Sequence, residues 1–273
     1  MALLLELMLI FVSVHLCSSF FLVCPKHTQC PNLPTGCLCR ESCPRFNFEI
    51  NCRQANFGSS LPRDTFMGVK SINSGLPIEL YLPDNLADIN IDAFNGIEAK
   101  IQSLNLRNST FVRIPAAFGK LHNLKALYLS GNHIQTLTYS DFNAFANNLY
   151  TLSISLKYMS AYPQFIDTLP VLWQLTLKDI PFEMNDMSIF SGNSVISTLT
   201  ITYSPTYRGP IIPPSIVNLS GLRSVYFYGS QIPCDCSLKY LQHWDVSKVG
   251  IISPCTTGIY EVLEYIKGDL QRC

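Results

Sequence analysis

Residues 124–132 read Leu124-Lys125-Ala126-Leu127-Tyr128-Leu129-Ser130-Gly131-Asn132. Leucines at the first, fourth and sixth places suit a short strand and its approach, in which alternate side chains point into a core. Asparagine at the ninth place suits a turn, because its amide side chain can bond the buried backbone of a neighbouring segment. A single stretch of this kind also fits an amphipathic helix, so its recurrence decides the fold.

The pattern recurs along most of the chain. Pairs of apolar residues separated by one residue begin at residues 80, 104, 127, 152, 175, 199 and 225, so successive copies lie 23 to 26 residues apart. Asn85 and Asn132 fit the turn position, and the other copies depart from it. This period resembles that of leucine-rich repeats. The resemblance implies an α/β solenoid, a horseshoe with a concave parallel β-sheet.

The opposite, convex half of each coil is expected to bury apolar residues from short helical or extended segments. The segments at residues 61–62, 91–94, 114–118 and 141–145 fit this role. Four prolines farther along predict later convex segments that are mostly non-helical, because proline lacks an N–H donor. These prolines are Pro163, Pro181, Pro213 and Pro214.

Length and composition favour one elongated domain. The chain has 273 residues, of which 48% are hydrophobic, enough for a continuous core along the repeats. Its formal net charge is zero, which argues against nucleic acid or an anionic membrane as a broad electrostatic partner. Residues 61–232 are expected to form about seven repeats, between caps at residues 20–60 and 233–273.

The N-terminus resembles a secretory signal peptide over residues 1–19, with cleavage near Ser19. No lysine or arginine precedes the apolar run, and Glu6 interrupts it. A retained signal anchor is the alternative, because residues 20–23 lengthen the apolar stretch towards spanning size. A secreted, extracellular protein without a membrane span in the mature chain is therefore expected.

The cysteines support this location. Cys17 lies in the expected signal peptide, and the other ten form two groups that flank the repeats. Disulfides are typical of oxidising compartments, and the ends of a solenoid need caps that cover its core. A metal cluster is a weaker reading of Cys37-Leu38-Cys39, because the N-terminal region supplies only His27 as a further nitrogen ligand. No metal or cofactor is expected.

Both caps resemble those of secreted leucine-rich-repeat proteins. Residues 46–52 alternate apolar and polar side chains, as a capping strand does. Residues 234–244 read C-D-C-x-L-x-x-L-x-x-W, with Leu238, Leu241 and Trp244 at helical spacing. The resemblance implies disulfides Cys30–Cys39, Cys37–Cys52, Cys234–Cys255 and Cys236–Cys273, which leaves Cys24 with Cys43. Spacing alone leaves fifteen connectivities for the six N-terminal cysteines.

The cap style and chain length are also loosely similar to an arthropod group around the non-catalytic subunit of the secreted shrimp luciferase. That resemblance implies a non-catalytic partner subunit. The residues themselves carry no familiar catalytic motif, so an enzyme is not expected. His122 and His133 are half a repeat apart, and Asp84, Asp88 and Asp92 lack the glycine turn of a calcium loop. We interpret all five as surface residues.

Residues between the inward leucines are expected to point from the concave face, which we predict to be the binding face. Tyrosine supplies apolar area and a hydroxyl to interfaces, although threonine and tyrosine also simply suit exposed strands. Tyr203 is expected to extend the C-terminal tyrosine group. The predicted binding residues are Tyr81, Asn105, Arg107, Tyr128, Thr176, Thr200, Tyr226 and Tyr228, among neighbours that include Thr151 and Ser153.

The sequence contains two sequons for N-glycosylation. They are Asn108-Ser109-Thr110 and Asn218-Leu219-Ser220, in which Asn108 and Asn218 would carry the glycan. The expected partner is another extracellular protein. Soluble recognition of glycan or foreign ligands, and assembly into extracellular matrix, are the alternatives.

Overall fold

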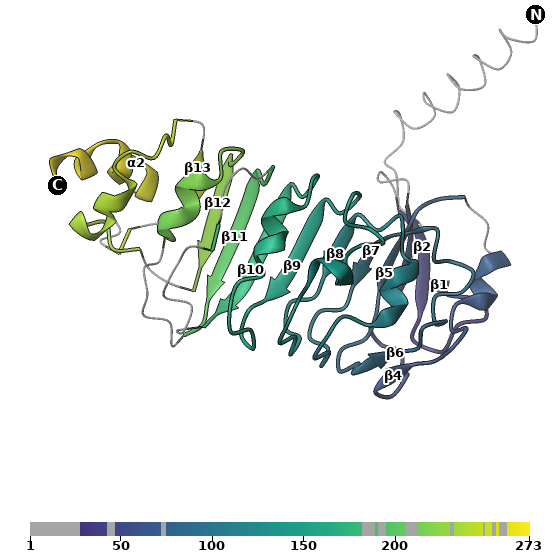
Figure 1. Cartoon of the computed structure of the whole chain (residues 1–273). Coiled ribbons are helices and arrows are strands. Elements are labelled where there is room, and N and C mark those ends of the chain that lie inside the picture. Colours follow the sequence, from purple (N-terminus) through teal and green to yellow (C-terminus); the bar gives the residue numbers. More distant parts are fainter. Residues whose placement is uncertain are drawn as a thin grey trace, which may run out of the picture.

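The computed structural model describes residues 28–42, 47–71, 75–181, 189–190, 195–205, 212–229, 232–247, 249–252, 255–256 and 261–273. Its main feature is an 11-stranded sheet in the order β1-β2-β3-β5-β7-β8-β9-β10-β11-β12-β13 (Figure 1). The two pairs β1–β2 and β2–β3 are antiparallel, and every later pair is parallel. The strands are β1 (Thr28–Gln29), β2 (Leu38–Ser42), β3 (Asn47–Asn51), β5 (Ile78–Tyr81), β7 (Ile101–Asn105), β8 (Ala126–Tyr128), β9 (Thr151–Ser155), β10 (Gln174–Ile180), β11 (Thr198–Tyr203), β12 (Ser224–Tyr228) and β13 (Gly250–Ile252).

Each predicted repeat contributes one strand, and the inward leucines lie in register. Leu127 pairs with Leu152, and Leu152 pairs with Leu175. These side chains are fully buried, as the period-2 pattern predicts. The sequence therefore placed both the strands and their inward residues correctly, and the parallel sheet is confirmed.

The side of each coil opposite the sheet carries short segments in place of regular α-helices. A small second sheet joins β4 (Ser60–Leu61) to β6 (Asp88–Ile89). The α-helix among the described residues lies in the C-terminal cap, and the other helices are 3₁₀. The α-helix is α2 (Val262–Lys267), and the 3₁₀ helices are η1 (Met67–Ser71), η2 (Ala116–Lys120), η3 (Tyr139–Asp141), η4 (Gln164–Thr168), η6 (Pro214–Asn218), η7 (Cys236–Leu241) and η8 (Asp269–Arg272).

Phenylalanines fill the core beneath these segments. Phe94, Phe118 and Phe142 are buried, as predicted for the apolar segments on the convex side of each coil. The Phe142 ring centre lies 5.2 Å from that of Phe165 in the next coil, so aromatic contacts continue from coil to coil. Three apolar residues of these segments are exceptions, because Ile91 is 52% exposed and Pro62 and Ala116 are also exposed.

The expectation of non-helical later coils is wrong at three prolines. Pro163 is the N-cap of η4, and Pro213 is the N-cap of η6, which begins at Pro214. Proline suits this place because its fixed φ fits the first turn, where its missing N–H would have no helical partner. Pro181 lies outside any helix or strand.

Asn132 has the predicted role at the turn. Its side chain is buried and donates to the carbonyl oxygens of Leu106 and Leu129, each at 2.8 Å. Its Oδ1 accepts the Phe111 backbone N–H at 3.2 Å. Asn85 differs, because it is exposed and has a φ of 68°. It belongs instead to a column of left-handed residues at or just after the ends of the strands, with Asn108, Gly131, Asp179 and Gly229.

Two disulfide bridges lie near each end of the solenoid. The bridges Cys30–Cys39, Cys37–Cys52, Cys234–Cys255 and Cys236–Cys273 are present as expected. Cys24, Cys43 and the expected signal peptide lie outside the described residues. No helix in the described part of the chain is long and apolar enough to span a bilayer.

The C-terminal cap covers the last coil with the predicted residues. Leu238, Leu241 and Trp244 are buried. Their three-residue spacing fits the 3₁₀ helix η7 and the turn after it. The Asp235 side chain caps η7 by accepting the Ser237 backbone N–H at 2.8 Å. Strand β13 then pairs with β12, so this cap also continues the sheet.

Candidate binding face

The solvent side of the large sheet, which we call the sheet face, presents aligned rows of side chains. Because the strands pair in register, one residue per strand falls into a central row. This row contains six of the eight predicted binding residues. It runs Asn51, Tyr81, Asn105, Tyr128, Ser153, Thr176, Thr200 and Tyr226.

Exposure along the face is uneven. Arg107 and Tyr228 are exposed, and Tyr81, Tyr128, Thr176, Thr200 and Tyr226 are partly buried. Asn105, by contrast, is 6% exposed, because it lies in register between the larger Tyr81 and Tyr128. Thr151 and Ser153 are also buried. These small polar residues form the floor of the face, and the tyrosines and arginine rise above it.

Tyr203 does not belong to the face. Its side chain is 3% exposed and lies in the core. The reason is strand parity, because Tyr203 falls on the same side of β11 as the buried Leu199 and Ile201. The expected contribution of Tyr203 to the C-terminal tyrosine group is therefore wrong.

A hollow of about 390 Å³ opens at the N-terminal end of the sheet face. We call it the N-terminal hollow. It crosses β2, β3, β5, β7 and β8, so it joins the cap to the first repeats. Its lining is largely polar and includes four predicted binding residues. The lining residues are Arg40, Glu49, Asn51, Arg53, Glu79, Tyr81, Asn105, Arg107 and Tyr128.

Two arginines of the hollow stack on tyrosine rings. The Arg53 guanidinium carbon lies 4.6 Å from the centre of the Tyr81 ring. The Arg107 guanidinium carbon lies 4.8 Å from the centre of the Tyr128 ring. In both pairs the arginine comes two residues after the end of one strand, and the tyrosine is the last residue of the neighbouring strand. A cation over an aromatic face is favourable and restricts the long arginine side chain.

The carboxylates of the hollow already have partners. Glu49 forms an ion pair with Arg40, with Nη2 and Oε2 2.7 Å apart. Glu79 accepts the Tyr81 hydroxyl at 2.5 Å and the Asn47 amide at 3.0 Å. Burial, the hydrogen bond to Glu79 and the nearby glutamates raise the pKa of Tyr81 far above its usual value. Tyr81 is therefore a neutral hydroxyl donor at physiological pH.

Sequence reasoning missed the residues that the cap contributes to this hollow. Arg40, Glu49, Asn51 and Arg53 lie on or beside β2 and β3, outside the repeat pattern from which the face was read. A signal was available, because the alternation of residues 46–52 places Glu49 and Asn51 on one side of their strand. Extending the repeat rows into the cap would have found both.

The C-terminal end of the face carries a second aromatic group. The rings of Tyr226 and Tyr228 are stacked, with centres 6.5 Å apart and planes 3° from parallel. Tyr228 is 54% exposed. Both are predicted binding residues, and they lie on β12 next to the C-terminal cap.

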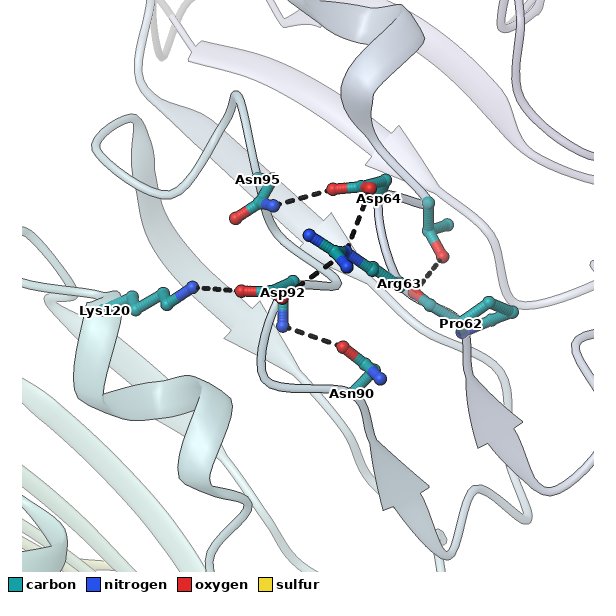
Figure 2. A network of polar contacts seen from close by, with 8 residues as sticks. Pro62, Arg63, Asp64, Asn90, Asp92, Asn95 and Lys120 are labelled. Atoms are coloured by element: carbon teal, nitrogen blue, oxygen red, sulfur yellow. Dashed lines mark hydrogen bonds and ion pairs between the residues drawn. The ribbon is translucent and has the colours of Figure 1, made fainter.

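The three spaced aspartates have different surroundings. Asp84 and Asp88 are exposed, as expected for surface acids. Asp92 instead links neighbouring coils on the side opposite the sheet, as Figure 2 shows. Its Oδ1 lies 2.6 Å from Lys120 Nζ, and its Oδ2 lies 3.5 Å from Arg63 Nε. The Lys120 contact lowers the pKa of Asp92 below its usual range.

The same network extends to Asp64, a second side chain from the preceding coil. Asp64 lies 3.3 Å from Arg63 Nε and accepts the Asn95 amide at 2.7 Å (Figure 2). Asn90 holds the turn by accepting the Asp92 backbone N–H at 3.0 Å. These groups satisfy one another, so the network is a structural tie between coils.

The two histidines lie apart from this network. His122 is exposed, and its Nδ1 lies 3.4 Å from the Ala144 carbonyl oxygen. The His133 ring meets the Tyr158 ring edge to face, with centres 4.6 Å apart. Each histidine thus has its own neighbours, in line with the interpretation as surface residues.

Both sequon asparagines are exposed. Asn218 donates to the Phe190 carbonyl oxygen at 2.9 Å. Asn108 belongs to the left-handed column, and its backbone N–H donates to Ser130 at 2.9 Å. Asn108 follows β7 beside Arg107. A glycan there would therefore border the N-terminal hollow.

Comparison with known proteins identifies the repeats. One family model described as Leucine rich repeat matches residues 79–134, and a second of the same description matches residues 123–148. No curated protein matches the chain. Among solved structures, an internalin from Listeria monocytogenes is 13% identical, with a TM-score of 0.41 over 76% of this chain and 54% of its own. The chain thus spans about half the length of that internalin.

Two further solved structures are similar at the same level. A chain of the octameric complex of Latrophilin 3, Unc5D and FLRT2 is 19% identical, with a TM-score of 0.46 over 72% of this chain and 67% of its own. Human 5T4, a trophoblast glycoprotein, is 16% identical, with a TM-score of 0.39 over 87% of this chain and 97% of its own. The family matches, the parallel sheet and the four bridges together identify the fold as a leucine-rich-repeat solenoid with disulfide-bonded caps near both ends.

Proposed function

We propose that this chain is a secreted, non-catalytic scaffold that binds another extracellular protein through its sheet face. The observation that carries the proposal is the continuous central row from Asn51 to Tyr226, which aligns one side chain from each of eight strands. A regular surface of this kind suits a large partner better than a small ligand.

The chemistry of the face supports a protein partner. Tyrosine and arginine are enriched where protein interfaces gain most of their affinity. Here they stand at both ends of the face, as Tyr81 with Arg53, Tyr128 with Arg107, and the Tyr226–Tyr228 stack. Between them the floor carries hydroxyl groups from Ser153, Thr176 and Thr200, which suit hydrogen bonding at an interface.

The disulfides support an extracellular location. Bridges such as Cys37–Cys52 and Cys236–Cys273 form and persist in oxidising compartments. The apolar residues at positions 1–19 are the sequence basis for secretion. The cap resemblance supports a finer form of the proposal, in which the chain is the non-catalytic subunit of a secreted complex.

The test is the native mass of the secreted protein purified from its source tissue, with mass spectrometry of every chain that co-elutes. A second chain in stoichiometric amount is the expected result. Elution as a single glycoprotein near its own mass, 30.6 kDa before processing, would contradict the proposal and favour soluble recognition. Self-association that persists in salt would contradict it in favour of a matrix protein.

A further inference from the structure

The N-terminal hollow has the charge of a site for an anionic group. Three guanidinium groups and two carboxylates line it, which leaves an excess of one positive charge. Arg40 neutralises Glu49, and the oxygens of Glu79 accept bonds from Asn47 and Tyr81. Of the remaining groups, Arg53 and Arg107 carry two positive charges and Glu79 carries one negative charge, so the excess of one positive charge lies with the two arginines.

These two arginines are available to a partner. Both are exposed, and neither forms an ion pair with any residue that the structure describes. Each guanidinium lies over a tyrosine ring, which limits its rotation, and its N–H groups form no ion pair with the described residues. An arginine held in this way loses less entropy when its planar fork binds a carboxylate. The hollow is thus prepared for carboxylate binding before a partner arrives.

We propose that the N-terminal hollow binds an acidic peptide segment of the protein partner, with one carboxylate on Arg53 and a second on Arg107. This inference rests on the proposed function, because it names the chemistry that one end of the sheet face recognises. Arg53 follows β3 and Arg107 follows β7, with β5 between them. Two strand spacings separate them by about 10 Å, which fits two carboxylates of one segment better than one small anion.

The floor of the hollow also suits a peptide. Asn105 lies between the two arginine–tyrosine pairs, and its Oδ1 accepts the Arg107 backbone N–H at 3.3 Å. Its Nδ2 makes no hydrogen bond to the described residues, so it is a donor for a peptide carbonyl oxygen. Asn51 supplies a second amide to the lining.

A sulfated glycan fits this hollow less well. One face of the Tyr81 ring and one face of the Tyr128 ring are already covered by a guanidinium group, so neither of these faces is open for stacking on a sugar. An excess of one positive charge is also small for a polymer that carries many sulfates. Glycan binding is therefore the competing outcome of the test.

The experiment measures fluorescence anisotropy of a labelled decapeptide of alternating Glu and Ser, titrated with the full-length secreted protein at low salt. A decapeptide of alternating Gln and Ser is the uncharged control, and a heparin oligosaccharide is the glycan probe. The test variants are Arg53→Glu and Arg107→Glu. Lys178→Glu is the matched control, because Lys178 lies on β10 of the same face, outside the hollow, and the charge change is the same.

The acidic peptide is expected to bind at least ten times more tightly than its uncharged control. Each test variant is expected to weaken this binding at least tenfold, and Lys178→Glu to change it less than twofold. Arg53→Gln and Arg107→Gln should give losses in the same direction, which shows that a reversed charge has not acted by unfolding the site. Thermal midpoints equal to that of the unmodified protein confirm that each variant is folded.

Three results would overturn the inference: equal peptide binding by the unmodified protein and both test variants, an equal loss in Lys178→Glu, or heparin binding through Arg53 and Arg107 without peptide binding. Capture of the native partner separates this inference from the proposed function. If the Arg53→Glu/Arg107→Glu double variant captures the partner with unchanged affinity, the hollow assignment is wrong and the scaffold proposal stands. If the unmodified protein elutes alone, the scaffold proposal fails, and the peptide titration still decides the chemistry of the hollow.

Discussion

The Asn132 side chain donates a 2.8 Å hydrogen bond to the Leu106 carbonyl oxygen, one coil earlier in the solenoid. The same side chain accepts the Phe111 N–H at 3.2 Å, so one buried amide satisfies a donor and an acceptor of the neighbouring coil. The stretch that identifies the repeat thus also contains the residue that ties two coils together.

Replacing Asn132 with alanine should lower the free energy of unfolding by about 3 kcal/mol, because buried backbone groups lose their partners. Urea unfolding followed by circular dichroism measures the change. Asn143→Ala is the control, since Asn143 is exposed, and it should stay within about 0.5 kcal/mol. Equal effects of the two substitutions would show that the buried amide is not a tie between coils.

Gly131 is required by both its conformation and its neighbours. Its φ is 82°, and a Cβ atom there would lie 2.4 Å from Asn108 Oδ1. Gly131→Ala should therefore cost about 2 kcal/mol of stability, chiefly from the left-handed backbone. Gly119→Ala is the matched control, because Gly119 lies in η2 with open space around its Cα, and it should be neutral or slightly stabilising. Thermal unfolding of both variants tests this, and a neutral Gly131→Ala would refute the requirement.

The disulfides should differ in their contribution to stability according to the loops that they close. Cys236–Cys273 spans 37 residues, and Cys30–Cys39 spans 9. Loop entropy predicts that replacing the first pair with alanine costs about 4 kcal/mol, and replacing the second about 2.5 kcal/mol. Denaturant midpoints of the two double variants give the comparison. A larger loss from the Cys30–Cys39 pair would contradict the loop-entropy explanation.

Asp92 should make stability depend on acid pH through Lys120. The Lys120 contact lowers the pKa of Asp92 in the folded protein, so its contribution is present above the usual carboxyl pKa and is lost as pH falls through the lower folded value. Lys120→Gln should raise the pKa of Asp92 towards its usual value and flatten the stability profile at acid pH. Lys125→Gln removes an exposed lysine elsewhere and should change neither the pKa of Asp92 nor the stability profile at acid pH. Carboxyl NMR titration measures the pKa of Asp92, and an unchanged pKa in Lys120→Gln would refute the pairing of Asp92 with Lys120.

The repeat period made much of the fold predictable. Leu127, Leu152 and Leu175 recur at a fixed spacing and are buried in register, because each coil must cover the same side of its neighbours. The described disulfides also follow the pattern that the cap resemblance implies. The left-handed column was missed because Asn108, Gly131 and Asp179 are different residue types that share one backbone conformation.

The candidate site was predictable only where it follows the repeats. Tyr81, Tyr128 and Arg107 were read directly from the strand pattern. Arg53 was not, because it follows a cap strand that joins the sheet without belonging to a repeat. Pairing of each arginine with a tyrosine of the next strand depends on side-chain conformation, which a pattern along one chain does not contain.

The most direct test of the sheet face as the binding face is the dissociation constant of the captured partner for three variants. Thr176→Arg places a large charged side chain at the centre of the face, and Tyr226→Ala/Tyr228→Ala removes the C-terminal tyrosine stack. Both should weaken binding by more than about 1 kcal/mol, which is a factor of about five. Tyr139→Ala, on η3 opposite the sheet, should bind as the unmodified protein does. Unchanged affinity of both sheet-face variants, with a loss in Tyr139→Ala, would contradict the assignment and place the partner on the other side of the solenoid.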